Sequence, residues 1–298
     1  MRVFVTGATG FIGSAIVQEL INSGHRVLGL ARSDAAAKSL AAAGAQVHRG
    51  NLEDLQSLHS GAAAADGVIH TAFGHDFSKY QANCETDRRA IEALGGALAG
   101  SGRPLIVTSG TALLSWGRLG SEEDEPASGS SALPRVASEE AAATVAARGI
   151  RVSVLRLPPT VHGDGDRGFV PLLIGLARDK GVSAYVGEGA NRWPAVHRLD
   201  TALLYRLVLE KGAAWARYHG VAEEGVRLRD IAGVIGRRLN APLVSKAAEQ
   251  ATDHFGWLAP FAAIDNPASS RRTRELLGWQ PRQPGLIADI DRPEYFEA

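Results

Sequence analysis

The first half of the chain alternates short apolar runs with longer alanine-rich amphipathic stretches. The apolar runs predict strands at Arg2–Thr6, Arg26–Ala31, Ala45–Arg49, Gly67–Thr71, Pro104–Thr108 and Arg151–Arg156. The stretches between them predict helices, of which Ile12–Ser23, Ala35–Ala43 and Tyr80–Ala99 are the clearest. Strands that are apolar throughout and separated by helices indicate an α/β fold, a Rossmann-type doubly wound parallel sheet.

The pattern changes after Arg156. Prolines and glycines crowd one loop, namely Pro158, Pro159, Gly163, Gly165 and Gly168. Beyond this loop, short strands and helices follow at no fixed period, which predicts a smaller C-terminal substrate lobe. We expect residues 1–157 to form the dinucleotide-binding domain, with 195–220 returning to it, and residues 158–194 and 221–298 to form the lobe. The acidic, Ser/Gly/Pro-rich stretch Ser115–Pro134 predicts a surface loop over the cleft.

Composition narrows the class of protein. The 298 residues carry 32 acidic and 32 basic side chains, and this balance argues against a nucleic-acid partner. Cys84 is the single cysteine, so no internal disulfide framework can form. No apolar run approaches the roughly 20 residues that span a bilayer, and no charged-then-apolar leader opens the sequence. We therefore predict a cytoplasmic protein without a membrane contact.

The segment from Val3 to Gly13 carries the strongest chemical signal. Gly7, Gly10 and Gly13 recur every third residue between a strand and an amphipathic helix. In a dinucleotide-binding turn the first glycine permits the tight turn, the second lets the diphosphate approach the backbone, and the third lets the helix pack on the sheet. The cofactor-binding residues predicted here are Thr6, Gly7, Thr9, Gly10, Phe11, Ile12 and Gly13. A tight turn without a ligand is the alternative.

The end of the second predicted strand bears on the choice of cofactor. An NAD site would place a carboxylate there to bind the ribose, but the chain reads Leu30-Ala31-Arg32-Ser33. Arg32 could bind a 2′-phosphate with both arms of its guanidinium while Ser33 adds a hydroxyl donor, which favours NADP and leaves NAD as the alternative. Asn51 and Leu52 are expected beside the adenine. Thr71, Ala72 and Phe73 are expected to flank the rest of the cofactor.

These features resemble the extended short-chain dehydrogenase/reductases, which include nucleotide-sugar epimerases and dehydratases. The resemblance rests on segments spread along almost the whole chain: Thr6–Gly13, Val68–Ala72, Arg156–Gly163, Gly187–Asp200 and Ser269–Pro281. It implies that Pro158 contacts the cofactor and that a small molecule is the substrate. The sequence also allows a homodimer.

The catalytic set of that family is not matched. Members use a serine or threonine after the fifth strand and a Tyr-x-x-x-Lys pair, in which the lysine lowers the tyrosine pKa. Here Gly110 takes the serine position, and by register Arg135 takes the tyrosine position and Glu139 the lysine position. Arginine stays protonated and cannot act as a general acid or base. An Arg/Glu pair four residues apart predicts a helix salt bridge. The pattern resembles the atypical subgroups of the superfamily, which keep the cofactor fingerprint and lack the usual catalytic set.

Other side chains at the carboxyl ends of the strands are then the candidates for chemistry. The catalytic candidates are Ser109, Thr111, His75 and His162, and the two histidines are the more plausible proton donors because imidazole titrates near neutral pH. The alternative for each histidine is a structural role. The substrate-binding candidates are Phe169, Trp193 and His197, of which the two aromatics could instead pack the lobe. No metal-ligand spacing occurs.

Three functions remain open on this basis. The first is an atypical NADPH-dependent oxidoreductase that moves hydride between the nicotinamide and a carbonyl or alcohol carbon. The second is a non-catalytic dinucleotide-binding redox sensor or regulator, which the missing tyrosine and lysine favour. The third is a nucleotide-sugar epimerase or dehydratase, a weaker option because those reactions depend on the missing tyrosine. The complete second lobe, with Trp193–His197, favours an enzyme.

Overall fold

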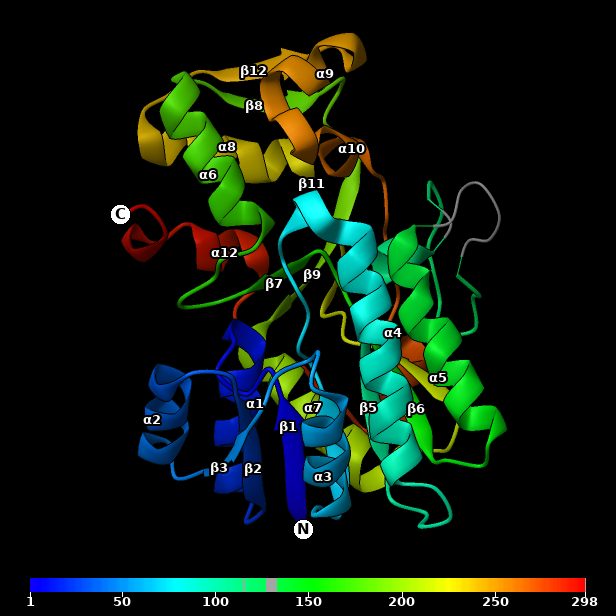
Figure 1. The fold of residues 1–298 in the computed structure, drawn as a ribbon. Helices are drawn as coiled ribbons and strands as arrows, with labels where there is room; N and C mark the ends of the chain where they lie inside the picture. Colours follow the sequence, from blue (N-terminus) through cyan, green and yellow to red (C-terminus); the bar gives the residue numbers. More distant parts are fainter. Residues whose placement is uncertain (115, 127–132, 298) are drawn as a thin grey trace.

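A computed structural model describes residues 1–114, 116–126 and 133–297 (Figure 1). Its centre is a seven-stranded sheet in the order β10-β6-β5-β4-β1-β2-β3, with every neighbouring pair parallel. The strands are β1 (Arg2–Thr6), β2 (Arg26–Ala31), β3 (Gln46–Arg49), β4 (Gly67–His70), β5 (Leu105–Gly110), β6 (Val152–Leu157) and β10 (Ala216–His219). The predicted Rossmann-type parallel sheet is confirmed, and its order reverses direction beside β1, where such sheets bind ligands.

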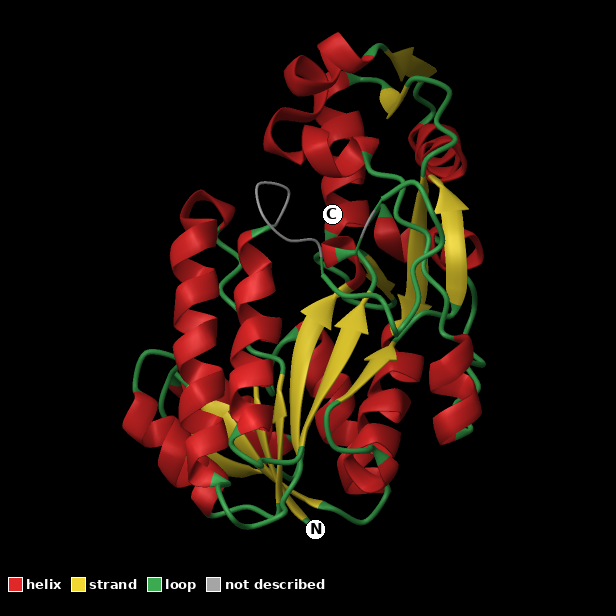
Figure 2. Cartoon of the chain, turned by 90° about the vertical axis from the view of Figure 1, so that its right-hand side faces the viewer, coloured by secondary structure: helices red, strands yellow, loops and turns green. Residues whose placement is uncertain are grey.

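Helices cover both faces of this sheet (Figure 2). One face carries α1 (Phe11–Asn22), α2 (Asp34–Ala42) and α7 (Arg198–Lys211), and the other carries α3 (Leu55–Ala63), α4 (Tyr80–Ala97) and α5 (Ala137–Ala147). Apolar positions at helical spacing, such as Ile16 and Leu20 on α1, are fully buried against the strands. Side-chain caps fix two helix starts: Ser33 accepts the Ala36 amide and Asp54 accepts the Ser57 amide.

A smaller lobe with its own core lies beyond the carboxyl ends of the strands (Figure 1). It contains a three-stranded sheet of β7 (Thr160–His162), β9 (Arg192–His197) and β11 (Glu223–Arg227), and a two-stranded sheet of β8 (Ser183–Val186) and β12 (Leu243–Lys246). Its helices are α6 (Phe169–Lys180), α8 (Leu228–Leu239), α9 (Ala248–Phe255), α10 (Ala259–Ala263) and α12 (Leu286–Ile290).

The chain crosses between the two parts more often than the sequence suggested. Besides α7 and β10, α11 (Arg271–Leu277) packs on the large domain, where Trp279 is fully buried in the core that also contains α7. The Trp279 indole Nε1 donates to the Asp200 carbonyl at 3.0 Å. The division predicted from the sequence assigns all of 221–298 to the lobe. Trp279 is instead buried against α7, because burial of a large apolar ring is favourable.

Two loops of the large domain extend toward the lobe. Residues 71–79, ending in a short 3₁₀ helix at Phe77–Lys79, rise from β4 toward the lobe and lead into α4 (Figure 1). Of the predicted loop Ser115–Pro134, residues 115 and 127–132 lie outside the described residues. In its described part, the Gly117 and Gly120 amides donate to the Asp265 and Pro267 carbonyls, so the loop is joined to the segment after α10. Within the described ranges, no helix has the length and apolarity to cross a bilayer.

Candidate cofactor and substrate site

The turn between β1 and α1 leaves room for a ligand at one of its three glycines. Gly7 has φ 70°, and a Cβ there would lie 2.7 Å from Thr71 Oγ1 and 2.8 Å from the Ala72 nitrogen. A Cβ at Gly13 would lie 1.9 Å from the Gly7 carbonyl oxygen. Both glycines are therefore required by packing. A Cβ at Gly10 would meet only the Gly7 carbonyl oxygen, at 3.1 Å, so the space in front of Gly10 is not filled by protein.

The start of α1 also offers free hydrogen-bond donors. Gly10 is its N-cap and no side chain caps the helix, so the first amides, at Phe11 and Ile12, have no acceptor within the helix. Thr9 and Gly10 are exposed and Phe11 and Ile12 are half-buried. Uncapped amides and the positive end of the helix dipole suit a diphosphate group. The turn thus fits a dinucleotide on grounds independent of its sequence pattern.

The residues predicted to bind the adenosine half of the cofactor follow β2 and β3. Arg32 is exposed, and Ser33 keeps its hydroxyl hydrogen free because its oxygen accepts the Ala36 amide. The neighbouring Asp34 carboxylate accepts from Arg49 at 2.6 Å, so its negative charge is compensated. After β3, Asn51 Oδ1 accepts the Glu53 and Asp54 amides at 2.8 and 3.1 Å. The Asn51 side chain therefore shapes its loop, and half-buried Leu52 packs on the core.

A buried chain of hydrogen bonds joins the phosphate turn to the start of α5. Thr6 Oγ1 lies 2.7 Å from His70 Nδ1, and His70 Nε2 lies 2.9 Å from Asp87 Oδ1. Burial opposes ionisation of Asp87, but Arg135 and His70 outweigh it and hold the Asp87 pKa well below its usual value. Because Asp87 is ionised and can only accept, His70 donates to it through Nε2. Thr6 is thus an internal link of the scaffold.

The predicted salt bridge between Arg135 and Glu139 does not form. Arg135 donates to Asp87 Oδ2 at 2.5 Å and to the Thr108 carbonyl at 3.1 Å, and its guanidinium lies 4.0 Å from the Phe73 ring centroid. Glu139 is buried and accepts two hydrogen bonds from Arg156 on β6, at 2.7 and 2.8 Å. Each side chain turns to a partner that is buried with it, because an uncompensated buried charge is costly. The helical spacing gave no signal of these partners.

The hydroxyls of Ser109 and Thr111, which are predicted to be catalytic, form hydrogen bonds within the protein. Both residues are buried. Ser109 Oγ donates to Glu139 at 2.7 Å, and Thr111 Oγ1 donates to Asn266 Oδ1 at 3.1 Å while the Asn266 amide returns a bond to the Thr111 carbonyl. The end of β5 is thus held by internal hydrogen bonds, and Gly110 presents no side chain.

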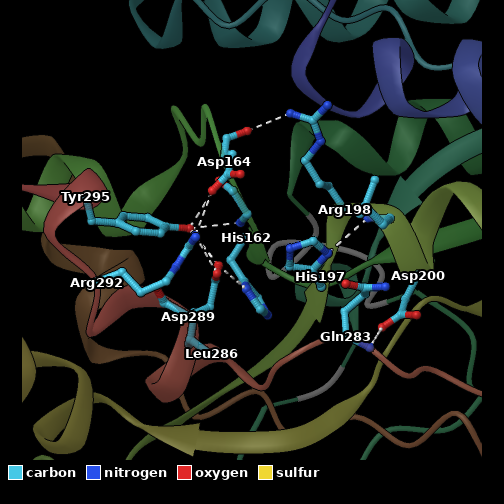
Figure 3. A network of polar contacts seen from close by, with 12 residues as sticks. His162, Asp164, His197, Arg198, Asp200, Gln283, Leu286, Asp289, Arg292 and Tyr295 are labelled. Carbon is cyan, nitrogen blue, oxygen red and sulfur yellow. Dashed lines mark hydrogen bonds and ion pairs between the residues drawn. The ribbon is translucent and has the colours of Figure 1, made fainter.

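The two candidate histidines lie in different surroundings. His75 is exposed and approaches Phe73 edge-on, with ring centroids 5.7 Å apart. Desolvation by nearby protein and, after it, the positive charge of Arg135 lower the His75 pKa. His162 is buried, with Nδ1 2.8 Å from Asp289 Oδ2 and its ring against His197 (Figure 3). Only His75 therefore combines access to solvent with contact to the residues that follow β4.

The three predicted substrate-binding residues also separate. Trp193 is 1% exposed and donates through Nε1 to the Phe261 carbonyl, so it packs the lobe core. His197 is the N-cap of α7, where its Nδ1 accepts the Leu199 amide. Both side chains thus have contacts within the protein, and their role in substrate binding stays a prediction. Phe169 is half-buried and lies among the aromatic rings described next. Pro158, predicted to contact the cofactor, is buried after β6.

Aromatic side chains from both parts of the molecule meet beyond β4 and form what we call the aromatic wall. Its members are Phe73, Phe77, Tyr80, Phe169, Trp257 and Phe261. Phe77, from the large domain, stacks on Trp257 of the lobe with ring centroids 4.7 Å apart. Trp257 nevertheless stays 50% exposed. Phe77, Trp257 and Phe261 were missed from the sequence, since only the fold brings them together.

The wall carries no charge near neutral pH. Its one titratable member is Tyr80, and burial raises the Tyr80 pKa to about 12, which keeps the phenol protonated. The guanidinium of Arg135 lies beneath Phe73 and is neutralised by Asp87. In the parts of the chain that the structure describes, no group of His, Cys, Asp and Glu side chains could hold a metal ion. The arrangement thus suits an apolar ligand beside the predicted nicotinamide end of the cofactor.

Comparison with known proteins agrees with this architecture. Residues 3–219 match the model of the NAD dependent epimerase/dehydratase family. An uncharacterized protein of Schizosaccharomyces pombe is 53% identical over 99% of this chain and 100% of its own length. A 2-alkyl-3-oxoalkanoate reductase of Stenotrophomonas maltophilia is 30% identical over 83% of this chain and 78% of its own. A dTDP-glucose 4,6-dehydratase from Streptomyces venezuelae, solved with NAD, superposes with TM-score 0.77 and 22% identity over 100% of this chain and 97% of its own.

Proposed function

Because the chain belongs to the NAD-dependent epimerase/dehydratase family, we propose that it is an NADP-dependent oxidoreductase whose substrate is an apolar aldehyde or ketone. The proposal has three parts: the cofactor, the substrate class and the proton donor. The family contains oxidoreductases, epimerases and dehydratases, so the residues of this chain must decide among them.

The preference for NADP rests on the end of β2. Arg32 and the Ser33 hydroxyl stand where the adenosine ribose of a bound dinucleotide would lie, and no uncompensated carboxylate stands beside them, since Asp34 pairs with Arg49. The uncapped turn at Gly10 would hold the diphosphate. When bound, the cofactor supplies the hydride that is exchanged with the carbonyl carbon.

The substrate class rests on the aromatic wall, which is the observation that carries the proposal. Its rings extend from Phe73, directly after β4, to Trp257 on the lobe, so that a ligand next to the nicotinamide would contact them. Burying an apolar ligand against such rings is favourable by about 25 cal/mol per Å². A sugar diphosphate would instead need free cations, and Arg135 is already paired. The relative from S. maltophilia is by name a reductase of 2-alkyl-3-oxoalkanoates.

The proton donor that we assign is His75. The hydroxyls of Ser109 and Thr111 are engaged in internal hydrogen bonds. Arg135 cannot release its proton. His162 is buried against Asp289. His75 is exposed and touches Phe73 edge-on, so its imidazole can reach an oxygen held beside the aromatic wall. In carbonyl reduction His75 would give a proton to the new alkoxide, and in alcohol oxidation it would accept one.

The test is a panel of substrates, in which the decrease in NADPH absorbance measures turnover. We expect turnover of apolar carbonyl compounds, such as medium-chain 2-alkanones and aryl ketones, and none of glyceraldehyde or a nucleotide sugar. Trp257→Ala should raise KM for the apolar substrates by about tenfold, because an aromatic contact is lost. Trp215→Ala removes a similarly exposed indole outside the wall and should leave KM unchanged.

Two outcomes would contradict the proposal. Conversion of the nucleotide sugar without net oxidation of NADPH, detected by chromatography of the products, with the apolar carbonyls inert, would assign the epimerase or dehydratase function. Tight NADPH binding with no turnover of any compound in a broad panel, tested in both directions, would assign the redox-sensor function.

A further inference from the structure

One cation lies beside the phosphate turn but comes from the start of α7, which follows the lobe strand β9. Arg198 is the first residue of α7, directly after the N-cap His197. Its guanidinium carbon is 5.0 Å from the ring centroid of Phe11, the first residue of α1, and its Nη2 is 3.5 Å from Ser14 Oγ. The side chain thus lies over the first turn of the helix whose free amides face the diphosphate site.

The charge of Arg198 is not compensated in the part of the chain that the structure describes. Its Nη1 donates to the Asp164 carbonyl at 2.6 Å, but no carboxylate lies within ion-pair distance (Figure 3). The Asp164 carboxylate is 2.8 Å from Arg292 instead. The Nε of Arg198 is buried and has no hydrogen-bond partner among the described residues. A buried donor without an acceptor is costly, so a ligand or an ordered water is expected to complete it.

A cation would add to the charge that the turn itself offers a diphosphate. Residues Thr6–Gly13 contain no basic side chain, while a diphosphate carries two negative charges. The helix dipole contributes only about half a positive charge at the N-terminus. We propose that Arg198 binds the diphosphate of the dinucleotide and so supplies the positive charge that the turn lacks. This inference rests on the proposed cofactor function, but not on the identity of the substrate.

A loop of the lobe holds Arg198 in this place. Gly163 has φ 131°, and a Cβ there would lie 2.9 Å from Arg198 Cγ and 2.9 Å from His197 Nε2. The Gly163 amide donates to the Tyr295 hydroxyl at 2.8 Å, which also contacts Asp289 Oδ2 at 3.1 Å (Figure 3). The loop after β7 is therefore fixed by the C-terminal segment. Gly163 is a positioning residue that leaves room for the arginine stem.

The experiment compares two ligands that share one half of the site. NADPH carries both the 2′-phosphate and the diphosphate, whereas adenosine 2′-monophosphate carries only the former. We expect Arg198→Ala to weaken NADPH about 10- to 100-fold by isothermal titration, since a charge-assisted contact is lost, and to leave the affinity for adenosine 2′-monophosphate unchanged. Arg32→Ala should weaken both ligands.

Three further variants guard against a trivial result. Arg198→Lys keeps the charge and should recover part of the NADPH affinity. Gly163→Ala should lower NADPH affinity by displacing the stem of Arg198, while the arginine itself is kept. Arg229→Ala removes a guanidinium that lies 5.6 Å from the Tyr185 ring in the lobe and should change neither ligand.

The inference and the proposed function can fail separately. An NADPH affinity of folded Arg198→Ala within twofold of the parent, with Arg32→Ala still weakened, would overturn the role of Arg198 and leave the cofactor assignment intact. Equal loss of both ligands in Arg198→Ala would also overturn it, because the effect would not be specific to the diphosphate. A parent protein that binds neither NADPH nor NADH would remove the proposed function itself.

Discussion

The phosphate turn and the end of β5 lie at the same edge of the sheet, yet they use their polar groups in opposite ways. At the turn, the amides of Phe11 and Ile12 have no acceptor among the residues that the structure describes. At β5, the hydroxyls of Ser109 and Thr111 are paired internally with Glu139 and Asn266. Unpaired donors cost stability unless a ligand completes them, whereas paired ones stabilise the fold. The phosphate turn, the open half of the site, therefore offers its donors to a ligand, whereas the end of β5, the closed half, pairs its hydroxyls within the protein.

The largest effect is expected at the open half. Gly10→Val would place a branched side chain in the space before the turn, and we expect a loss of about 10⁴-fold or more in NADPH affinity, because several charge-assisted N–H contacts of about 1.5–3 kcal/mol each are removed together. Calorimetric titration measures the loss. Gly96→Val, at a position where a Cβ meets nothing within 4 Å, is the control. An unchanged affinity in Gly10→Val would make the open half an ordinary turn.

The next largest effect tests whether His75 is the proton donor. His75→Ala should lower kcat of carbonyl reduction by about 10²–10⁴-fold, while His59→Ala, exposed on α3, should not. The His75 pKa is lowered below its ordinary value of 6.5, so the proton-donating form is populated only in acid. Reduction should therefore speed up as the pH falls from 7 toward 5, and oxidation should show the reverse. A pH profile that survives His75→Ala would exclude this histidine.

At the closed half, we expect substitutions to change the free energy of unfolding. Glu139→Gln leaves the fully buried Arg156 without its counter-charge, and we expect a loss of about 3–5 kcal/mol in the free energy of unfolding at pH 7. Glu275→Gln, which breaks an exposed pair with Arg271, should cost less than about 0.5 kcal/mol. Urea unfolding followed by circular dichroism gives both values. Equal costs in the two variants would mean that the closed half contributes no special stability.

The same pair has a pH dependence whose sign follows from the pKa. Burial opposes ionisation of Glu139, but Arg156 and Ser109 outweigh it, so the folded-state pKa lies below the unfolded one. The stabilisation is therefore complete above the unfolded pKa of about 4.3 and is lost as the pH falls through the lower folded value. The free energy of unfolding of Glu139→Gln, measured by urea unfolding, should depend less on pH below pH 4 than that of the parent.

The smallest effect sharpens the open half. Arg32→Ala should weaken NADPH about 10- to 100-fold and leave NADH nearly unchanged, because only NADPH carries the 2′-phosphate. Lys38→Ala, exposed on α2, is the matched control. Dissociation constants for both cofactors, measured by fluorescence titration, decide the matter. A parent protein that binds NADH and NADPH equally would contradict the assigned preference.

The sequence predicted the open half better than the closed one, and the reason is the distance between partners. The six strands of the first half and the glycine turn are encoded by local patterns, and β1 and β2 were predicted with the bounds that the structure has. The partners of Arg135 and Glu139 were not, because Asp87 is 48 residues from Arg135 and Arg156 is 17 residues from Glu139. Asn266 is 155 residues from Thr111. No helical periodicity carries information about such pairs.

The return of α11 and Trp279 to the large domain has a consequence for how this molecule can be divided. A gene fragment ending near residue 157 would encode six strands but would lack β10, α7 and the indole that buries itself against them. Neither part of the chain is therefore a module that could be exchanged between proteins at a single junction. Recombination would have to preserve the whole interleaved chain, and engineering of substrate range is better sought by point changes in the lobe than by transplanting it.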